Sequence, residues 1–239
     1  MKRIALAVIL VALIAVSSFS VALAKPAVPS ARDMGRGVFI DYGYSSPPWY
    51  PPEEETDSYK WAPKYYWADP SILVKVNPTA SGFPAEELDS IVAEVSKGFA
   101  AWDAASGPFG ASVSRDDAVA PSLVTPDGVN TVSWGTLDGA GGIIAVTYYW
   151  YYLNTKELVD CDIIFDAAEP WSISASVPSD KYDVWNIATH EAGHVLVLGD
   201  LRSPKDGALT MHAYSWWGDD LKRTLGAGDI LGIRAIYGE

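Results

Sequence analysis

The chain has 239 residues and a formal net charge of −13, with 30 acidic residues against 17 basic ones. This length is enough for one domain of ordinary size with a substantial core. The acidic balance argues against nucleic acid as a partner, because binding to phosphates needs clusters of Lys and Arg that are absent here. The single cysteine, Cys161, excludes an internal disulfide, so a packed core, with or without metal ions, must stabilise the fold.

Residues 1–24 have the pattern of a secretory signal peptide. A short basic start precedes an apolar run over 4–16 that is too short to span a bilayer, and Ala-Leu-Ala closes the segment at 22–24. We expect cleavage after Ala24 and a secreted, extracellular protein without membrane attachment. The alternative is an uncleaved membrane anchor.

Residues 25–56 differ in composition from the rest of the chain. The stretch GYSSPPWYPPEEETDSY (43–59) combines prolines, aromatics and acids, which favours extended, poorly packed chain. We interpret 25–56 as a propeptide, a spacer or an arm lying on the domain surface. The globular pattern begins near Tyr59, and we place the domain at 57–239.

The first predicted elements of that domain are a strand and a long helix. SILVKV (71–76) reads as a strand, and the segment 82–107 predicts a helix with Pro84 in its first turn. NTVSWGTL (130–137) is the next strand candidate. The apolar face of the predicted helix consists of Ile91, Val92, Val95, Phe99 and Trp102.

A β-hairpin and two helices follow. The runs 142–152 and 157–166 flank LNTK and predict the hairpin. Cys161 alternates with the apolar set of the second arm, which favours a buried small hydrophobe over a catalytic thiol. Asp183 is positioned to cap the next helix, and the last helix is expected over 227–238. This order implies an α+β domain with the late helices gathered on one side.

The stretch ATHEAGH (188–194) carries two of the three histidines in the chain. Residues four apart on a helix lie on one face, so His190 and His194 can both direct an imidazole nitrogen at one cation. Glu191 is rotated by about 100° from His190, a poor position for a ligand but a suitable one for holding water. Zinc hydrolysis needs such a set, in which the metal acidifies water and the carboxylate takes its proton. The alternative is a helix with two ordinary histidines.

Several separated motifs resemble, in order, the catalytic domain of matrixins, the metzincin metallopeptidases that include matrix metalloproteinases. The resemblance covers roughly residues 57–239 and implies a twisted mixed sheet, an active-site helix and a C-terminal helix. It also implies a zinc endopeptidase that acts as a monomer on protein or peptide substrates. The matching stretches are NTVSWGTLDGAGGIIAVTYYW, DCDIIFDAAEPW, ATHEAGHVLVLGDL, ALTMHAYS and KRTLGAGDILGIRAIYG.

By position, the resemblance implies that His190 and His194 are zinc ligands and that Glu191 is the general base. Met211 matches the methionine of the turn below the zinc. The resemblance also implies an inhibitory cysteine before the domain, but residues 25–56 contain none. Either another group in that segment blocks the site, or the enzyme needs no activation.

Two positions after the second histidine depart from the family pattern. The third histidine of the family falls on Asp200, whose oxygen is an acceptable zinc ligand. We favour Asp200 over the competing third ligand, His212. The glycine of the family at the turn is Val197 here, and a β-branched residue resists a left-handed backbone. We therefore expect Gly199 to take over the turn.

The resemblance also implies a calcium site. LDGAGGIIAV matches the calcium loop of the family, and Asp138, Asp166 and Glu169 would supply hard oxygen ligands. The alternative is a Gly-rich turn with solvated acids. Val146 and Ile164 stand where histidines would hold a second, structural zinc, so we expect one zinc ion rather than two.

Substrate contacts are expected at a sheet edge and beyond the methionine. Ile143, Ile144 and Ala145 should form the edge that pairs with extended substrate. Tyr214 and the tryptophans of SWWG (215–218) should shape the specificity pocket, with core packing of the tryptophans as an equal alternative.

A second function class remains open at this point, a non-catalytic exported protein with a metzincin fold that serves binding or adhesion. Val197 and Asp200 leave room for it, whereas the intact HEAGH sequence argues against it.

Overall fold

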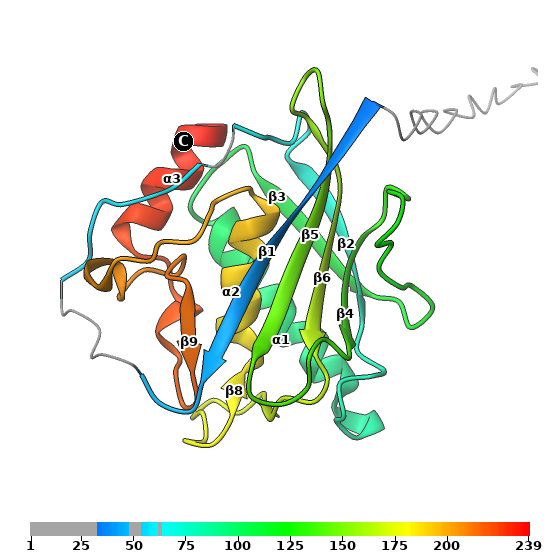
Figure 1. The fold of residues 1–239 in the computed structure, drawn as a ribbon, viewed down its shortest axis with the longest axis vertical. Coiled ribbons are helices and arrows are strands. Elements are labelled where there is room, and N and C mark those ends of the chain that lie inside the picture. The colour runs from blue at the N-terminus through cyan, green and yellow to red at the C-terminus, as the bar shows by residue number, and fades with distance from the viewer. Residues whose placement is uncertain (1–32, 48–53, 62–63) are drawn as a thin grey trace, which may run out of the picture.

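The computed structural model describes residues 33–47, 54–61 and 64–239. Within those ranges, one mixed sheet has the strand order β3-β2-β4-β6-β5-β1-β9, and β7 and β8 form a separate pair (Figure 1). The strands are β1 (Met34–Tyr44), β2 (Ser71–Asn77), β3 (Gly110–Arg115), β4 (Asn130–Gly135), β5 (Ile143–Tyr152), β6 (Leu158–Asp166), β7 (Trp171–Ser172), β8 (Tyr182–Asp183) and β9 (Tyr214–Trp216). The helices are α1 (Leu88–Asp103), α2 (Val184–Val195) and α3 (Ala227–Tyr237), with 3-10 turns at Ala85–Glu87, Pro204–Asp206 and Leu221–Arg223. The predicted signal peptide, 1–24, lies outside the described residues.

The predicted α+β architecture is confirmed, with differences at the ends of elements. β5 and β6 form the predicted antiparallel hairpin, in which Tyr149 lies opposite Cys161. The helix predicted over 82–107 is shorter, because a 3-10 turn precedes α1. The short strand β3 has no strong apolar pattern and escaped prediction.

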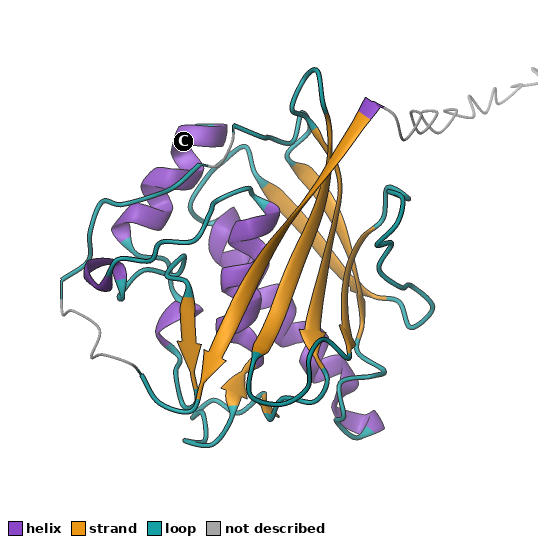
Figure 2. Cartoon of the chain, in the orientation of Figure 1, coloured by secondary structure: helices purple, strands orange, loops and turns teal. Residues whose placement is uncertain are grey.

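Helices α1 and α2 pack against each other and against the sheet to form the core (Figure 2). Gly98 allows α1 to approach α2 closely, since a Cβ at this position would lie 2.7 Å from the carbonyl carbon of Ala188. The Trp102 indole donates a hydrogen bond to the Thr189 carbonyl at 2.8 Å. The helix that carries the histidines is therefore held in close contact with α1.

The N-terminal segment that we expected to be poorly packed supplies a strand of the main sheet. β1 pairs antiparallel with β5 along most of its length and parallel with β9 near its end. Figure 1 shows β1 passing across α2 between these two strands. Met34 and Asp41 are buried, so 34–44 is an integral part of the described fold. The composition was misleading because strand pairing over more than 100 residues leaves no local signal.

Both sides of β6 are covered. Cys161 lies on the core side and is buried among the apolar residues as predicted, and burial raises the pKa of its thiol. The adjacent residues Asp160 and Asp162 are also buried, at 0% and 1% exposure, because the segment 116–129 lies over them. The Ser122 amide donates to Asp162 at 2.8 Å and the Asp127 amide to Asp160 at 2.7 Å.

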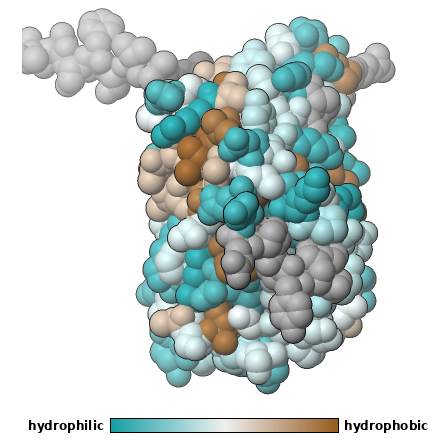
Figure 3. Space-filling view, turned by 90° about the vertical axis from the view of Figure 1, so that its left-hand side faces the viewer, coloured by the Kyte–Doolittle hydropathy of each residue, from teal (hydrophilic) through white to brown (hydrophobic). Residues whose placement is uncertain are grey.

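No helix of the described part of the chain is both long and apolar enough to cross a membrane. On the face shown in Figure 3, hydrophobic residues are scattered among hydrophilic ones.

Candidate metal centre

Helix α2 places the HEAGH sequence in the interior of the molecule. Asp183 caps the helix as predicted, since its side chain accepts a hydrogen bond from the Asn186 amide at 2.9 Å. Arg223 pairs with the same carboxylate at 2.7 Å. His190, Glu191 and His194 are each fully buried.

The two histidines present the same nitrogen to a common point. Nδ1 of His190 donates to the Thr210 carbonyl at 2.7 Å, and Nδ1 of His194 donates to the Leu198 carbonyl at 2.8 Å. These bonds assign the proton to Nδ1 and leave the lone pair of each Nε2 for a ligand. Both Nε2 atoms are buried without a hydrogen-bond partner.

Asp200 completes this set. Its Oδ1 lies 3.6 Å from His190 Nε2 and 3.4 Å from His194 Nε2. Burial works against ionisation of Asp200, but the adjacent side chains of His190 and His194 outweigh it and hold the pKa of Asp200 well below its usual range. The Asp200 side chain thus stays an anion that can ligate a cation.

The pKa values of the histidines reflect the same environment. Burial lowers the pKa of His190, and the nearby Lys222 ammonium lowers it further. Burial opposes protonation of His194 as well, yet the Asp200 carboxylate outweighs it and raises the pKa of that imidazole.

The donor set fits a zinc ion. Three buried atoms, two imidazole nitrogens and one carboxylate oxygen, converge without other partners, and they form one of two candidate metal groups among the described residues. Nitrogen and oxygen donors of this type are usual for zinc. His190, His194 and Asp200 would hold the ion.

The turn that delivers Asp200 is built differently from our expectation. Val197 itself adopts a left-handed backbone with φ of 64°, and Gly199 is not among the positive-φ residues of the described chain. The Val197 amide donates to the His194 carbonyl and the Leu198 amide to the Gly193 carbonyl, which closes the end of α2. Val197 is fully buried, so packing holds it in a conformation that its branched side chain disfavours.

His212, the alternative third ligand, does not belong to either candidate metal group of the described residues. Its ring lies edge-on to Tyr214 at 5.4 Å between centroids, and burial lowers the pKa of His212 to about 4. The geometry therefore favours Asp200.

Glu191 lies beside the metal ligands with one carboxylate oxygen held. Thr147 in β5 donates to Oε2 at 2.5 Å, while Oε1 is buried without a hydrogen-bond partner. Burial raises the pKa of Glu191 to about 7. The Glu191 carboxylate has an oxygen within 4.8 Å of a ring nitrogen of His190, so it lies close enough to the metal ligands to accept a proton there.

Met211 packs beneath α2 as expected for the methionine below the site. A Cβ at Gly193 would lie 2.2 Å from its sulfur. Asp229, at the third position of α3, accepts hydrogen bonds from the amides of Thr210, Met211 and Gly226.

Several of these residues escaped the sequence prediction. Asp229 was detectable, because it stands three residues after Gly226 at the start of a predicted helix, where a capping carboxylate is common. The role of Thr147 follows only from the pairing of β5 with its neighbours. Lys222 is buried, and its ammonium donates to the His212 carbonyl at 2.7 Å and to the Ser215 hydroxyl at 2.8 Å.

The sheet edge predicted for substrate is occupied in this structure. Ile143 pairs with Tyr42 and Ala145 with Asp41, both in β1, while Ile144 is fully buried. The edge is therefore not free in the described chain, which corrects our expectation of an open strand there.

The residues beyond Met211 also contact β1. Tyr214 lies opposite Tyr42 in the β1–β9 pairing. Trp217 packs against the core and lies 6.2 Å from Tyr182 between ring centroids, and Trp216 is 8% exposed. Both tryptophans thus contribute to packing, which was one of the two alternatives considered from the sequence.

The predicted calcium ligands converge on the Gly-rich loop, but as hydrogen-bond acceptors. The carboxylates of Asp138, Asp166 and Glu169 accept hydrogen bonds from amides between residues 137 and 143. None of the three belongs to a candidate metal group of the described residues. Calcium stays a prediction, and this geometry gives it no support.

Val146 and Ile164, at the positions considered for a second zinc, lie opposite each other in the β5–β6 hairpin and are buried. Aliphatic side chains offer no ligand atom, so these two positions contribute packing.

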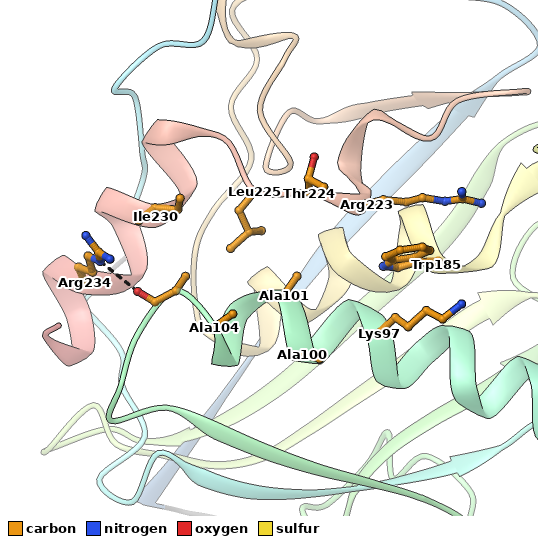
Figure 4. Close-up of a pocket in the computed structure, with 11 residues that line it drawn as sticks. Lys97, Ala100, Ala101, Ala104, Trp185, Arg223, Thr224, Leu225, Ile230 and Arg234 are labelled. Atoms are coloured by element: carbon orange, nitrogen blue, oxygen red, sulfur yellow. Dashed lines mark hydrogen bonds between the residues drawn. The ribbon is translucent and has the colours of Figure 1, made fainter. Parts of the chain in front are cut away.

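A groove of about 540 Å³ lies away from the metal ligands, between α1, α3 and the chain around residue 224. Figure 4 shows Leu225 and Ile230 in this groove, with Arg234 bonded to a carbonyl at its edge. The cations of Lys97 and Arg223 lie over the ring of Trp185 at 4.8 and 4.9 Å. No candidate metal ligand lines the groove.

Comparison with known proteins identifies the family of the chain. A family model described as Matrixin matches residues 72–238, which include all three predicted zinc ligands and Glu191. The chain belongs to the matrixin family. Strand β1 precedes the matched region of this matrixin.

A relative of this matrixin is described as a probable matrix metalloproteinase 095L of Invertebrate iridescent virus 3. It is 31% identical over 101 residues, which are 42% of this chain and 25% of the relative. The aligned part thus spans about a quarter of the length of that protein.

Proposed function

We propose that this matrixin is a secreted zinc-dependent endopeptidase that hydrolyses peptide bonds of protein substrates. The observation that carries the proposal is the convergence of three buried ligand atoms beside the oriented carboxylate of Glu191. The family supports the broader statement that the protein is a metallopeptidase.

The residues of the site would share the work of hydrolysis. His190, His194 and Asp200 would hold a zinc ion, which would supply Lewis-acid chemistry toward a substrate carbonyl and a water molecule when bound. The free oxygen of Glu191 takes the proton from the attacking water, while Thr147 keeps the carboxylate in place. Glu191 then transfers that proton to the leaving amine.

Export and the identity of the partners belong to the proposal. The signal-peptide pattern of 1–24 supports secretion, and the acidic net charge of −13 argues against nucleic acid as a partner. We propose a monomer that binds one zinc ion and no second, structural zinc.

Replacement of the general base tests the proposal. We expect the full chain to bind one zinc ion and to hydrolyse casein in a manner that a chelator abolishes and added zinc restores. Glu191→Gln should keep the zinc but lower the rate by a factor of about 10² or more, because general-base catalysis contributes that much. A Glu191→Gln protein as active as the wild type would refute the role of this residue.

Zinc content separates the two candidate third ligands in the same experiment. Asp200→Ala should lose most of its zinc after dialysis, whereas His212→Ala should keep it. Zinc binding by the wild type without any hydrolysis would favour the non-catalytic binding protein instead.

A further inference from the structure

Lys222 is a buried cation beside the metal ligands. The residue is only 3% exposed, although lysine is almost never fully buried unless it is paired. Its ammonium donates hydrogen bonds to the His212 carbonyl at 2.7 Å and to the Ser215 hydroxyl at 2.8 Å. Its third polar contact in the described chain is with Nδ1 of His190, at 3.3 Å. None of these three groups is a carboxylate, so no direct ion pair among the described residues cancels the charge.

The 3-10 turn Leu221–Arg223 fixes the position of this ammonium. The Lys222 amide donates to the Asn186 side chain in α2 at 2.6 Å. The next residue, Arg223, pairs with Asp183, which caps the same helix. Two successive residues of the turn are thus bound to the N-terminal end of α2. The ammonium therefore extends from a backbone that is fixed to the helix carrying the two histidines.

The contact with His190 differs from the usual surroundings of an imidazole ligand. Such a ligand commonly donates its second N–H to a carboxylate or a carbonyl, which makes it a stronger electron donor to the metal. Nδ1 of His190 donates to the Thr210 carbonyl at 2.7 Å, but the Lys222 ammonium adjoins the same nitrogen. A positive charge there draws electron density away from the ring and repels a second cation. Lys222 thus opposes the effect of the Thr210 carbonyl.

The charge of Lys222 also acts on the other imidazole that it approaches. Burial lowers the pKa of both His190 and His212, and the Lys222 charge contributes the next largest lowering. These two histidines come from α2 and from the chain after Met211. The influence of the ammonium therefore extends across both segments that border the metal ligands.

The charge that Lys222 faces across the site is negative. The family resemblance places a histidine where Asp200 stands, so the predicted ligand set carries one negative charge more than three neutral imidazoles would. Carboxylate oxygens of Asp41 and Glu191 also lie within 4.8 Å of a ring nitrogen of His190. Negative charge around a cation strengthens its binding but weakens it as a Lewis acid. A buried ammonium behind His190 offsets part of this negative charge.

We propose that Lys222 is a positioning residue of the metal centre, whose buried charge acts through His190 to offset the surrounding carboxylates and to keep the bound ion a strong Lewis acid. The charge assignment rests on the metal centre alone, while its effect on hydrolysis rests on the proposed peptidase function. A purely structural lysine would instead hold the chain around 212–215 to α2 through its hydrogen bonds. The two roles predict different changes in metal affinity when the charge is removed.

Metal affinity tests the charge assignment independently of activity. The full-length wild type, Lys222→Met, Lys222→Gln and Lys222→Arg are loaded with Co²⁺, and the affinity is measured by competition with a chelator. We expect Lys222→Met and Lys222→Gln to bind the metal about tenfold more tightly, because the repulsion between two cations is removed. Lys222→Arg keeps the charge and should match the wild type.

The choice of variants separates charge from hydrogen bonding. Glutamine retains an amide that can donate to the His212 carbonyl or the Ser215 hydroxyl, whereas methionine does not. Lys205→Met removes the same charge at an exposed position and is the matched control, with the affinity of the wild type expected. Circular dichroism identifies a misfolded Lys222→Met, in which case Lys222→Gln decides.

Casein hydrolysis by the zinc-saturated forms tests the effect on the reaction. Lys222→Met and Lys222→Gln should be about tenfold slower than the wild type, since a weaker Lewis acid polarises the substrate less. Lys222→Arg should retain most of the activity, and Lys205→Met all of it. Tighter metal binding combined with slower hydrolysis is a result that loss of a structural contact would not give.

The outcomes separate this inference from the proposed function. Unchanged or weaker metal binding by the folded Lys222→Met and Lys222→Gln would overturn the charge assignment. Tighter binding with undiminished hydrolysis would overturn the effect on the Lewis acid. Tighter binding with no hydrolysis by any form, the wild type included, would leave the charge assignment standing and contradict the peptidase function.

Discussion

At the scale of single residues, Val197 illustrates how a tertiary structure overrides a local preference. Its φ of 64° lies in the left-handed region, where a non-glycine residue costs about 1–2 kcal/mol. Its side chain is fully buried beneath the turn that leads to Asp200. The burial of the isopropyl group, worth about 1.5–3 kcal/mol, is large enough to offset that cost.

Substitutions at Val197 measure this balance. We expect Val197→Gly to be more stable than Val197→Ala by about 1 kcal/mol, because glycine adopts the left-handed conformation without strain. Chemical denaturation of the metal-free proteins gives the free energies of unfolding.

Val195, two residues earlier in α2, is the matched control. It is 2% exposed and helical, so Val195→Ala should be more stable than Val195→Gly by about 1 kcal/mol, the reverse order. The same order at both positions would show that the strain at Val197 is negligible.

A buried chain of polar groups also becomes visible at this scale. The Lys222 ammonium donates to Ser215, which in turn donates to Asp41. Lys222 thereby supports the carboxylate that enters the metal site. No motif marks these three residues, which are separated by up to 181 positions in the numbering of the chain.

At the scale of elements, β1 is held by the fit between its glycines and the tyrosines of β5. The strand is long, with 11 residues, and borders β9 on its other side. Removing β1 would expose the β5 edge that was expected to bind substrate. The stability of this one strand therefore determines whether the β5 edge is free to pair.

A bulky residue at Gly37 should loosen β1 without altering a metal ligand. In Gly37→Val the Cβ would lie 2.1 Å from the Tyr149 ring, and overpacking of this kind costs about 1–3 kcal/mol. We expect amide hydrogen exchange in 34–44 to accelerate by about tenfold or more. Exchange measured by mass spectrometry, peptide by peptide, reports this change.

Gly110 in β3 provides the control for a glycine in a strand. A Cβ there has no atom within 4 Å, so Gly110→Val should leave the exchange of β1 unchanged. Equal protection of β1 in Gly37→Val and the wild type would contradict the proposed fit.

At the scale of the whole molecule, the segment 116–129 buries a pair of carboxyl groups on the outer face of the sheet. Burial raises the pKa of Asp160 to about 6 and that of Asp162 to about 7. Both groups bind protons more tightly in the folded protein than in the unfolded chain. Stability is therefore greatest below the unfolded pKa and falls as the pH rises through the folded values.

The melting temperature should accordingly decrease between about pH 4 and pH 7 on account of this pair. Asp160→Asn and Asp162→Asn should each flatten the decrease, since an amide does not titrate. Thermal melts of the metal-free proteins across this range measure the slope, with Asp180→Asn at an exposed position as the control. A slope that neither buried substitution alters would contradict the prediction.

The local parts of the site could be predicted from the sequence. The spacing of His190, Glu191 and His194 determines their directions because the helix period is a property of adjacent backbone bonds. The cap at Asp183, the β5–β6 hairpin and the burial of Cys161 were also predicted from local sequence patterns. Each depends on residues that are close together in the chain.

The remaining parts of the site could not be predicted in this way. Gly199 was expected to form the turn after α2. The turn is at Val197 instead, where hydrogen bonds at the end of α2 and the burial of the side chain hold the left-handed backbone. The composition of residues 25–56 favoured extended, poorly packed chain, a propeptide, a spacer or a surface arm. It could not show the pairing of 34–44 with β5, whose residues lie more than 100 positions away.

The sequence by itself determined the fold class, the family and the predicted ligand pair of α2, since helix periodicity and short motifs are encoded locally. Only the tertiary structure decided that Asp200 joins His190 and His194, that Asp41 lies beside His190 and Glu191, and that β1 pairs with the edge of β5. These relations join distant segments through burial and strand pairing, and their free energies exist only once the core has formed.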